Sequence, residues 1–574
     1  MKKIKIMALL LASAMIMMSG VGCSNGGDEK VEKESSALQT ESTESAQKAE
    51  SEVTFKDTIV YALWSSPDGF FNPALSNTTY DGSVNGLVYD SLIGYDVNMK
   101  MIPAMAKSWS VSEDEKTLSF ELRNDIKWHD GQTVTSEDVV FTFESLADAG
   151  YTGAYGSTVE GIVGYDEYNA GDADHISGIN VEGQTISIEL KDVYAPALMN
   201  IGQFGILPKH IWGEVAVADW QESSELLANP IGCGPYKFVE FEDGHHLKLE
   251  ANEDYFDGPV ATKNFIFKIT SRDSVQVELE NGEVDIADVS DMKPNDIQDL
   301  EANGIALSSF PNNLIQYMGF NLRDDRFKDI KVRSAIMHGI DRKLMVDVLV
   351  GGQGQLINTP MIPTGWAYPD ASSLNPYEYD VEKAKALLAE AGWEDRDNDG
   401  ILEDKDGNDF KVVLTYPSGD KSREDSAPII QSYMKDLGVD MELEMLEFKA
   451  TMAKVVGNHE FDLYLMGNSL DSDPDPKPYW HSTAMSDEKG VYAWNIAGFQ
   501  NVDADSLMEA GLATTDQNER TKIYNDFGVL MNKELPWVTL YSKDIMMAHN
   551  PHLKNYNPST YTRFVDVEDW KIEN

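Results

Sequence analysis

Cysteine and basic residues are both scarce in this chain of 574 residues. The two cysteines, Cys23 and Cys233, cannot form a network of disulfides that would hold a small core together. Lysine and arginine number 46 against 97 aspartates and glutamates, which gives a formal net charge of −51. Because nucleic-acid phosphates attract clustered basic side chains, this balance argues against a nucleic-acid partner and predicts an acidic, solvated surface.

Sequence signatures of catalysis and of metal binding are also missing. The chain has no HExxH and no glycine-rich phosphate loop, and after residue 53 it has no GxSxG. Its ten histidines stand singly except for His245 and His246. Asp395–Asp406 imitates a calcium loop but ends in aspartate where a bidentate glutamate is usual, so we interpret it as a turn. We therefore expect no enzyme, no cofactor and no metal site. A secreted glycoside hydrolase stays open as an alternative, because its two carboxyl groups need only lie about 5 to 10 Å apart.

The N-terminus has the pattern of a secretion signal. A basic start, MKKIK, precedes the apolar run IMALLLASAMIMM, which is too short to span a bilayer comfortably. The small residues of SGVGC then lead into Cys23, as in the cleavage box of bacterial lipoproteins, where the cysteine is diacylated and becomes the first residue. We expect a lipoprotein signal peptide at residues 1–22 and lipidation of Cys23. Residues 23–53 contain almost no large apolar side chain and are expected to form a disordered tether.

The rest of the chain has what a folded protein needs. Hydrophobic residues make up 42% of the sequence, with 11 tryptophans, and the length suggests about two to four compact units. Ser108–Glu144 predicts a strand, a turn and a helix, because apolar residues alternate from Leu118 to Leu122 and Thr135 with Asp138 fits a capping box. Such helices alternate with strands along the chain, which indicates an α/β or α+β class.

Several longer stretches carry a family resemblance through their order and spacing. They are the Ser108–Glu144 block, NPIGCGPYKFVEF (229–241), NGEVDIA (281–287), VRSAIMHGIDR (332–342), YDVEKAKALLAEAGW (379–393) and ERTKIYNDFGVLMNKELPWVTLY (519–541). With them the chain resembles the substrate-binding lipoproteins of ATP-binding-cassette importers, in the family that binds oligopeptides, dipeptides and nickel. This is the bacterial extracellular solute-binding protein family 5.

The resemblance implies an α/β, two-lobed fold like that of periplasmic binding proteins, with a hinge between the lobes and an extra subdomain in the first lobe. Lobe I would comprise residues 54–312, with residues 540–574 returning to it. Lobe II would comprise residues 313–539. Closure around the hinge would bury a ligand between the lobes.

A proline-rich loop, NSLDSDPDPKPYWHS (468–482), lies in the expected second lobe. The prolines exclude a helix interior or a central strand. In peptide-binding members of the family, an aspartate of this loop receives the α-ammonium group of the peptide. In the better-known members this aspartate lies four positions before the proline, and the residue four positions before Pro476 is Ser472. We therefore expect the neighbouring Asp473 to take this role, because Pro474 restricts its backbone, with Asp471 as the second candidate. The alternative is that these acids only cap turns.

Other expected ligand-binding residues are aromatic or polar side chains near this loop or in the first lobe. They are Trp480, His481, Trp494, Asn495, Trp64 and Tyr80. Trp366 is a further tryptophan that could stack on a ligand, although most tryptophans are simply core residues. Cys233 replaces the threonine of the family pattern Gly-Thr-Gly-Pro-Tyr, and we interpret it as a packed free thiol.

These observations predict an extracytoplasmic lipoprotein, anchored to the cell membrane, that captures oligopeptides and delivers them to the permease of an ATP-binding-cassette transporter. The expected partners are the peptide ligand, the permease subunits and the membrane, with the protein itself a monomer. Oligosaccharide on the same scaffold is the alternative ligand, because tryptophans can stack on sugar rings. Peptide is favoured because unneutralised carboxylates suit an ammonium group better than an uncharged sugar.

Overall fold

The structure is a computed structural model that describes residues 54–574. The predicted signal peptide, Cys23 and the predicted tether lie outside the described residues. Within residues 54–574, no helix is long and apolar enough to cross a membrane. Strands and helices alternate along this part of the chain, which confirms the mixed α/β class.

The first large sheet has seven strands and is built mainly from the first half of the described chain. Its strands, in spatial order, are β12 (Ala306–Phe310), β19 (Ile545–His549), β11 (Ile286–Asp288), β1 (Thr58–Leu63), β10 (Asn264–Ile269), β9 (His246–Ala251) and β8 (Tyr236–Glu242). Successive side chains of a strand face opposite sides, and β1 is buried on both. Ile59 and Tyr61 enter one core, whereas Ala62 enters another beneath α7 (Val275–Glu280) and α8 (Pro294–Ala302).

A four-stranded antiparallel sheet forms the extra subdomain, and its buried side chains belong to the same core as Ile59 and Tyr61, called the first core below. Its order is β4 (Ala106–Val111), β5 (Thr117–Leu122), β7 (Thr185–Glu189) and β6 (Ile179–Glu182). Leu118, Phe120 and Leu122 of β5 are buried, as their alternation predicts. Helix α2 (Ser136–Ala147) opens with the predicted capping box of Thr135 and Asp138.

The second large sheet has six strands and belongs to the second half of the chain. Its order is β14 (Gly354–Leu356), β18 (Trp537–Lys543), β13 (Leu314–Phe320), β17 (Leu463–Ser469), β15 (Lys411–Pro417) and β16 (Asp440–Leu446). The two faces of β13 again enter separate cores, since Met318 and Phe320 join one and Ile315 and Tyr317 the other. The core that contains Met318 and Phe320 is closed by helices α10 (Ile330–Gly339), α11 (Arg342–Leu349), α12 (Val381–Glu390) and α13 (Lys421–Asp436).

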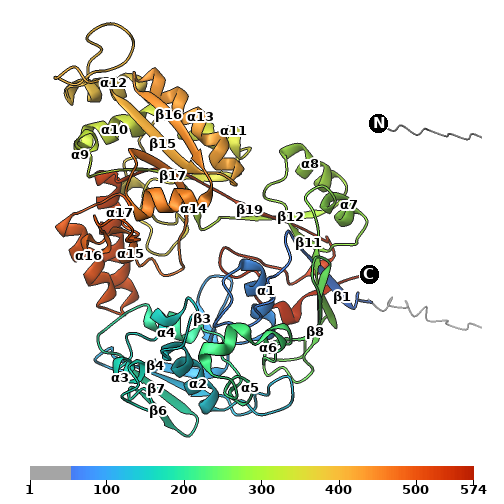
Figure 1. The fold of residues 1–574 in the computed structure, drawn as a ribbon. Helices are drawn as coiled ribbons and strands as arrows, with labels where there is room; N and C mark the ends of the chain where they lie inside the picture. Colours follow the sequence, from blue (N-terminus) through green and yellow to red (C-terminus); the bar gives the residue numbers. More distant parts are fainter. Residues whose placement is uncertain (1–53) are drawn as a thin grey trace, which may run out of the picture. The chain divides into compact units, whose positions relative to one another are not determined.

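The chain passes between the two large sheets twice. The first passage lies between β12 and β13, and the second is at Asp544, because β18 continues through Leu540 to Lys543 before β19 begins. Figure 1 shows the red β19 beside the green β12 and β11, with which it pairs in an antiparallel register. Two chain segments thus connect the halves, and each of them is only a few residues long.

The remaining elements are short helices and strands around these sheets. On the first half they are α1 (Thr79–Val88), β2 (Ile93–Tyr95), β3 (Met101–Pro103), α3 (Tyr165–Asn169), α4 (Ala197–Gly202), α5 (Lys209–Trp212), α6 (Ser224–Ala228), β20 (Leu553–Lys554) and β21 (Lys571–Ile572). On the second half they are α9 (Asp325–Lys328), α14 (Phe448–Thr451), α15 (Lys477–Trp480), α16 (Val502–Leu512) and α17 (Gln517–Glu534).

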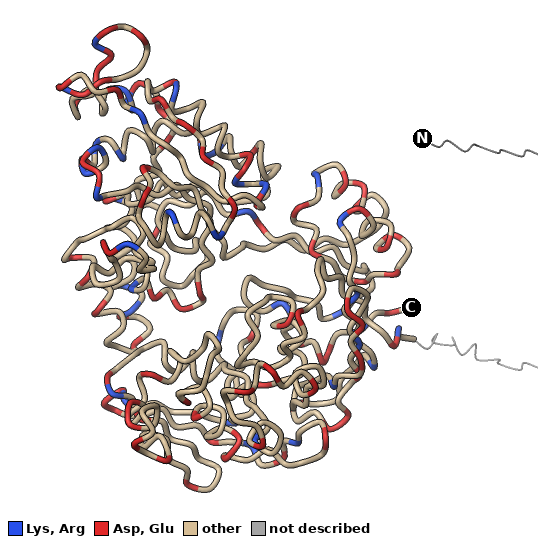
Figure 2. The backbone as a smooth tube through the Cα atoms, in the orientation of Figure 1, with Lys and Arg blue, Asp and Glu red and all other residues tan. Residues whose placement is uncertain are grey.

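Cys233 is a free, buried thiol in the first core, as predicted. Burial raises the pKa of this thiol, so it packs as a small neutral group. The glycine on its N-terminal side is required by space, because a Cβ atom at Gly232 would lie 1.8 Å from the carbonyl oxygen of Val88. Figure 2 shows acidic residues spread along the described chain, with basic residues among them.

Candidate ligand-binding site

The proline-rich loop follows β17 and leads into the short helix α15. Pro474 and Pro476 keep the backbone out of a regular element until that helix begins, and Pro478 lies in its first turn. The carboxylate of Asp475 accepts a hydrogen bond of 2.9 Å from the backbone N–H of Lys477, which stabilises the first turn of α15. For Asp475, the alternative that the loop acids only cap turns therefore applies.

Asp473 is held by an arginine of α17. The guanidinium of Arg520 donates two hydrogen bonds to the Asp473 carboxylate, at 2.7 and 2.8 Å, and the two side chains are only 5% and 10% exposed. Arg520 also donates to the carbonyl of Gly511 and lies 5.2 Å from the ring of Trp366. The charge of Asp473 is thus neutralised within the protein. The expectation that this carboxylate is unneutralised is therefore wrong, whereas which of the two aspartates contacts a ligand stays a prediction.

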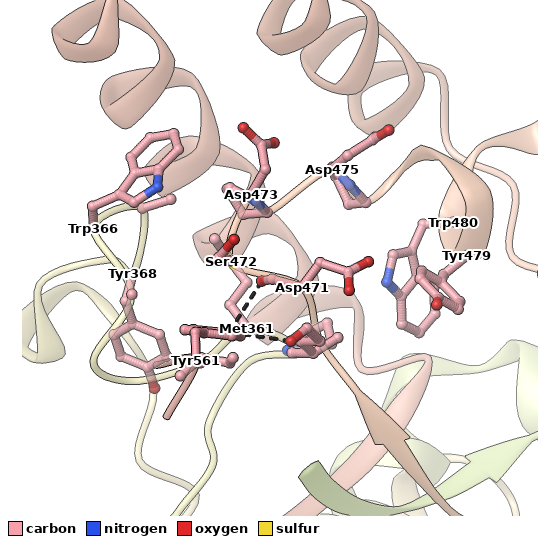
Figure 3. A pocket seen from close by; sticks show the side chains of 17 residues that line it. Met361, Trp366, Tyr368, Asp471, Ser472, Asp473, Asp475, Tyr479, Trp480 and Tyr561 are labelled. Atoms are coloured by element: carbon pink, nitrogen blue, oxygen red, sulfur yellow. Dashed lines mark hydrogen bonds between the residues drawn. The ribbon is translucent and has the colours of Figure 1, made fainter. Parts of the chain in front are cut away.

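Asp471 is the loop acid without a partner. Its backbone carbonyl accepts a hydrogen bond from the Tyr561 hydroxyl, but no group of residues 54–574 donates one to its carboxylate. Partial enclosure by the protein raises the pKa of Asp471, and the neighbouring charge of Asp473 raises it further. Figure 3 shows the carboxylate directed toward the rings of Tyr479 and Trp480, away from the direction taken by Asp473.

A pocket lies beside this carboxylate, and Asp471 is itself an exposed residue of the wall. Its walls come from three separate segments, residues 360–368, residues 470–480 and Tyr561 near the C-terminus. Trp480, a predicted site residue, is 2% exposed and packs 4.3 Å from the ring of Trp537, so it forms the floor of the pocket. The pocket therefore combines one unpaired carboxylate with aromatic walls.

His481 and Asn495 support the loop from behind instead of lining the pocket. Asn495 is fully buried and donates hydrogen bonds to the carbonyls of Trp480, His481 and Phe499. His481 is also buried, with Nδ1 2.7 Å from the hydroxyl of Thr483. These two predicted site residues lie one layer away from any ligand in the pocket.

The other predicted aromatic residues lie elsewhere. Trp494 is 49% exposed and lines none of the cavities described here. Trp64 borders a separate cavity of about 300 Å³ in the first half of the chain, with Arg272 5.8 Å from its ring. Tyr80 is near the same arginine, and burial raises the pKa of its hydroxyl. The structure does not bring these three residues together with the Asp471 pocket.

Three residues that complete the site were not assigned to it from the sequence. Tyr561 comes from the C-terminal segment, Arg520 from α17, and Met361 from a loop before α12. Arg520 could have been recognised in part from the sequence. A charged residue on the buried face of an amphipathic helix needs a partner of opposite charge. Trp366, named above only as a candidate for stacking, does line the pocket.

The acidic hairpin between α12 and β15 is separate from this site. Carboxylate oxygens of Asp395, Asp397, Asp399 and Glu403 lie within 4.8 Å of one another, and no other such group occurs in residues 54–574. Several of these oxygens accept hydrogen bonds from backbone N–H groups of the same hairpin, which is the role expected of a turn. None of the four residues lines the Asp471 pocket.

Besides the Tyr561 hydroxyl, which bonds to the carbonyls of Leu470 and Asp471, further contacts link the two halves of the described chain next to the site. The carboxylate of Glu115 accepts a hydrogen bond of 2.8 Å from the N–H of Thr515, and the N–H of Ala195 donates to the carbonyl of Leu512 at 3.0 Å. In addition, the Ser472 hydroxyl is 3.2 Å from the sulfur of Met199. The proline-rich loop and the α16–α17 connection thus touch the first half directly.

Comparison with known proteins places this arrangement among transport proteins. The oligopeptide-binding protein AppA of Bacillus subtilis (strain 168) is 30% identical over 507 residues, which are 87% of this chain and 89% of the relative. Its structure in complex with a nonapeptide superposes with a TM-score of 0.71 at 28% identity, covering 91% of this chain and 100% of that one.

Relatives with other ligands in their names are also similar. Heme-binding protein A of Haemophilus influenzae is 26% identical over 583 residues, 97% of this chain and 98% of the relative. The structure of NikZ from Campylobacter jejuni in complex with Ni(L-His) has a TM-score of 0.70 at 26% identity, covering 90% of this chain and 99% of that one.

The family model described as "Bacterial extracellular solute-binding proteins, family 5 Middle" matches residues 100–490, well over half of the chain. The two-lobed fold and the long alignments agree with that match. This chain therefore belongs to family 5 of the bacterial extracellular solute-binding proteins, the binding components of ATP-binding-cassette importers.

Proposed function

We propose that this protein captures oligopeptides between its two lobes and delivers them to the permease of an ATP-binding-cassette transporter. The observation that carries the proposal is the unpaired carboxylate of Asp471, which lines a pocket together with aromatic side chains from separate chain segments. A carboxylate in such a pocket is a receptor for a cation, and the α-ammonium group of a peptide supplies one.

This site chemistry favours peptide over the other ligands considered. An uncharged oligosaccharide would leave the Asp471 charge without compensation once water is excluded. No histidine or cysteine lines the pocket within the described chain, so it lacks the side chains that bind nickel or heme iron directly. A glycoside hydrolase would need a second free carboxylate across the ligand, whereas Asp473 is paired and Asp475 caps α15. The relationship to an oligopeptide-binding protein supports the same choice.

We also propose that the two groups of elements are lobes that close over the peptide. Lobe I would contain residues 54–312 and the segment after Asp544, and lobe II the residues between the two crossings. The short crossings would act as the hinge, since a hinge needs only a few residues that absorb a change of backbone angles. A ligand held by both lobes stabilises the closed arrangement in proportion to its preference for it.

Membrane attachment is a further part of the proposal. The sequence SGVGC after an apolar run supports diacylation of Cys23, with residues 24–53 as a tether that lets a monomer reach the permease. Mature protein is expected to begin at acylated Cys23, and a Cys23→Ala variant is expected to partition into the aqueous phase of a detergent extraction. Intact-mass measurement of unmodified protein that starts at another residue would contradict the anchor.

The role of Asp471 is tested by calorimetric titration with one peptide in two forms, with a free or an acetylated N-terminus. Asp471→Asn is expected to weaken binding of the free-amine form by on the order of 3–5 kcal/mol, because it leaves a desolvated ammonium group unpaired. Binding of the acetylated form, which brings no charge, should change little.

Asp475→Asn is the matched control, because this acid belongs to the same loop but its carboxylate already accepts a backbone hydrogen bond. It is expected to affect both peptide forms equally and weakly. Equal losses for the two forms in Asp471→Asn would show that Asp471 does not receive the ammonium group.

A further inference from the structure

A short segment near the C-terminus, residues 559–563, reaches from the first half of the chain to the proline-rich loop of the second half. We call it the C-terminal strap. It lies between Tyr556 and Trp570, which are both buried in the first core. The guanidinium of Arg563, at the end of the strap, donates a hydrogen bond of 3.3 Å to the carboxylate of Asp288. The strap is therefore fixed to the first half.

The strap is also bonded to the first crossing between the two large sheets. The Thr560 hydroxyl donates to the carbonyl of Pro311, the residue directly after β12, at 2.7 Å. Two residues further on, the carbonyl of Asn313 accepts the backbone N–H of Leu470 at 3.0 Å, and the Asn313 side-chain amide donates to the Leu470 carbonyl at 2.9 Å. Leu470 is the first residue after β17, so strap, crossing and proline-rich loop form one hydrogen-bonded unit.

Tyr561 of the strap completes this unit next to the unpaired carboxylate. Its hydroxyl donates to the carbonyl oxygens of both Leu470 and Asp471, each at 3.1 Å (Figure 3). These two carbonyls belong to the peptide groups on either side of the Asp471 Cα atom. Because peptide groups are planar, the orientations of these two groups determine the backbone angles of Asp471. Tyr561 thereby sets the direction in which the Asp471 side chain leaves the loop.

The Tyr561 hydroxyl is a permanent donor in this position. Burial raises the pKa of the phenol, and the nearby charge of Asp471 raises it further, so the group keeps its proton at physiological pH. The Asp471 carbonyl accepts no other hydrogen bond within residues 54–574. The ring of Tyr561 lines the Asp471 pocket, so a phenylalanine would keep the wall and remove only the donor.

We propose that Tyr561 is a positioning residue, which holds the Asp471 carboxylate in the direction that receives the ammonium group of the peptide. The inference rests on the proposed function and deepens it. Because Tyr561 belongs to the first half and Asp471 to the second, the ammonium site is complete only while the halves lie together. Binding of the ammonium group and closure are thereby coupled.

Calorimetric titration of the full-length protein with a panel of pentapeptides tests this role. The panel includes pentaalanine, and each peptide is used with a free and with an acetylated N-terminus. Tyr561→Phe should weaken binding of the free-amine forms about tenfold, because the carboxylate loses its fixed direction and the halves lose a contact. The acetylated forms lose only the contact between the halves and should weaken by at most about threefold.

A double-mutant cycle with Asp471→Asn separates positioning from a structural role. In the Asp471→Asn background, Tyr561→Phe should weaken the free-amine and acetylated forms by the same factor, because no carboxylate is left to position. Tyr368→Phe is the matched control and should change neither form, since Tyr368 lines the same pocket but donates to neither of these carbonyls.

Melting curves show whether each variant folds. If Tyr561→Phe does not, Thr560→Val decides the question, because it removes the bond between the strap and Pro311 and leaves Tyr561 in place. It should also weaken the free-amine forms more than the acetylated forms.

The outcomes separate this inference from the proposed function. An equal loss for the two peptide forms in folded Tyr561→Phe would overturn the positioning role and leave peptide capture intact. A loss of free-amine binding that is as large in the Asp471→Asn background as in the unmutated protein would do the same. Failure of the whole panel to bind the unmutated protein would overturn peptide capture itself, and the positioning role with it.

Discussion

At the scale of single residues, Asp471 and Asp473 show how the surroundings decide what a carboxylate can do. They stand two positions apart in one loop, but Arg520 binds only Asp473 with two hydrogen bonds. Asp473 is therefore neutralised within the protein, whereas the Asp471 carboxylate has no such partner in residues 54–574. Both residues are aspartates of the same loop, so the difference between them arises from Arg520 of α17.

Asp473→Asn should destabilise the fold, because it leaves the buried guanidinium of Arg520 without its counter-charge. The expected loss is on the order of 3–5 kcal/mol in the free energy of unfolding, measured by urea titration. Asp347→Asn is the control, since Asp347 pairs with Lys343 on the surface of α11 and should cost well under about 1 kcal/mol. A loss for Asp473→Asn no larger than that of the control would show that the buried pair does not stabilise the protein.

Asp90 makes the stability of the first half depend on pH. Burial raises the pKa of this carboxyl to about 7, although Ser91 N–H and the Tyr255 hydroxyl donate hydrogen bonds to it. Because the folded-state pKa lies above the ordinary value, the folded form binds the proton more tightly, and stability should fall as pH rises from about 4 to about 7. Above that range the loss is complete.

Asp90→Asn removes this ionisation and should raise the melting temperature at pH 8, with little or no gain at pH 5. Differential scanning calorimetry at the two pH values measures the effect. The same shift of melting temperature at both pH values would mean that ionisation of Asp90 is not its cause.

At the scale of elements, the sequence was informative where a structure depends on neighbouring residues. The capping box of α2 joins residues three positions apart, and the buried face of β5 follows from strict alternation. The Asp473–Arg520 pair joins residues 47 positions apart, and Tyr561 reaches the loop from 91 positions beyond Leu470. Contacts of that kind depend on how the lobes fold, so the candidate site was only partly predictable.

Trp494 and Asn495 show that the sequence also predicted site residues that do not line the pocket. They are adjacent in sequence and both were assigned to the ligand, but one is half exposed and the other is a buried support for the loop. Residue type alone does not distinguish a tryptophan in a binding site from one on the surface, nor an asparagine that binds a ligand from one that binds backbone carbonyls.

The turn between β4 and β5 contacts the α16–α17 connection through Glu115 and Thr515. We expect the bond between Glu115 and Thr515 to stabilise the closed arrangement. Glu115→Asn should then weaken the binding of free-amine and acetylated peptides about equally. Asparagine is too short to reach Thr515 but tolerates the positive φ of 58° at this position, which alanine would not. Calorimetry with both peptide forms measures the effect, and a loss confined to the free-amine form would assign Glu115 to the ammonium site.

At the scale of the whole molecule, two sheets with separate cores are joined by two short crossings, and the unpaired acid lies where the halves meet. This architecture is that of the family, and the proposal of a peptide ligand rests on the site. The central claim is that the ligand is a peptide whose ammonium group is held by Asp471.

Native mass spectrometry of protein produced in rich medium, followed by sequencing of the released ligand, tests this claim most directly. The account predicts a mixture of intact peptides with free N-termini. A released sugar, metal complex or porphyrin in place of peptides would contradict it.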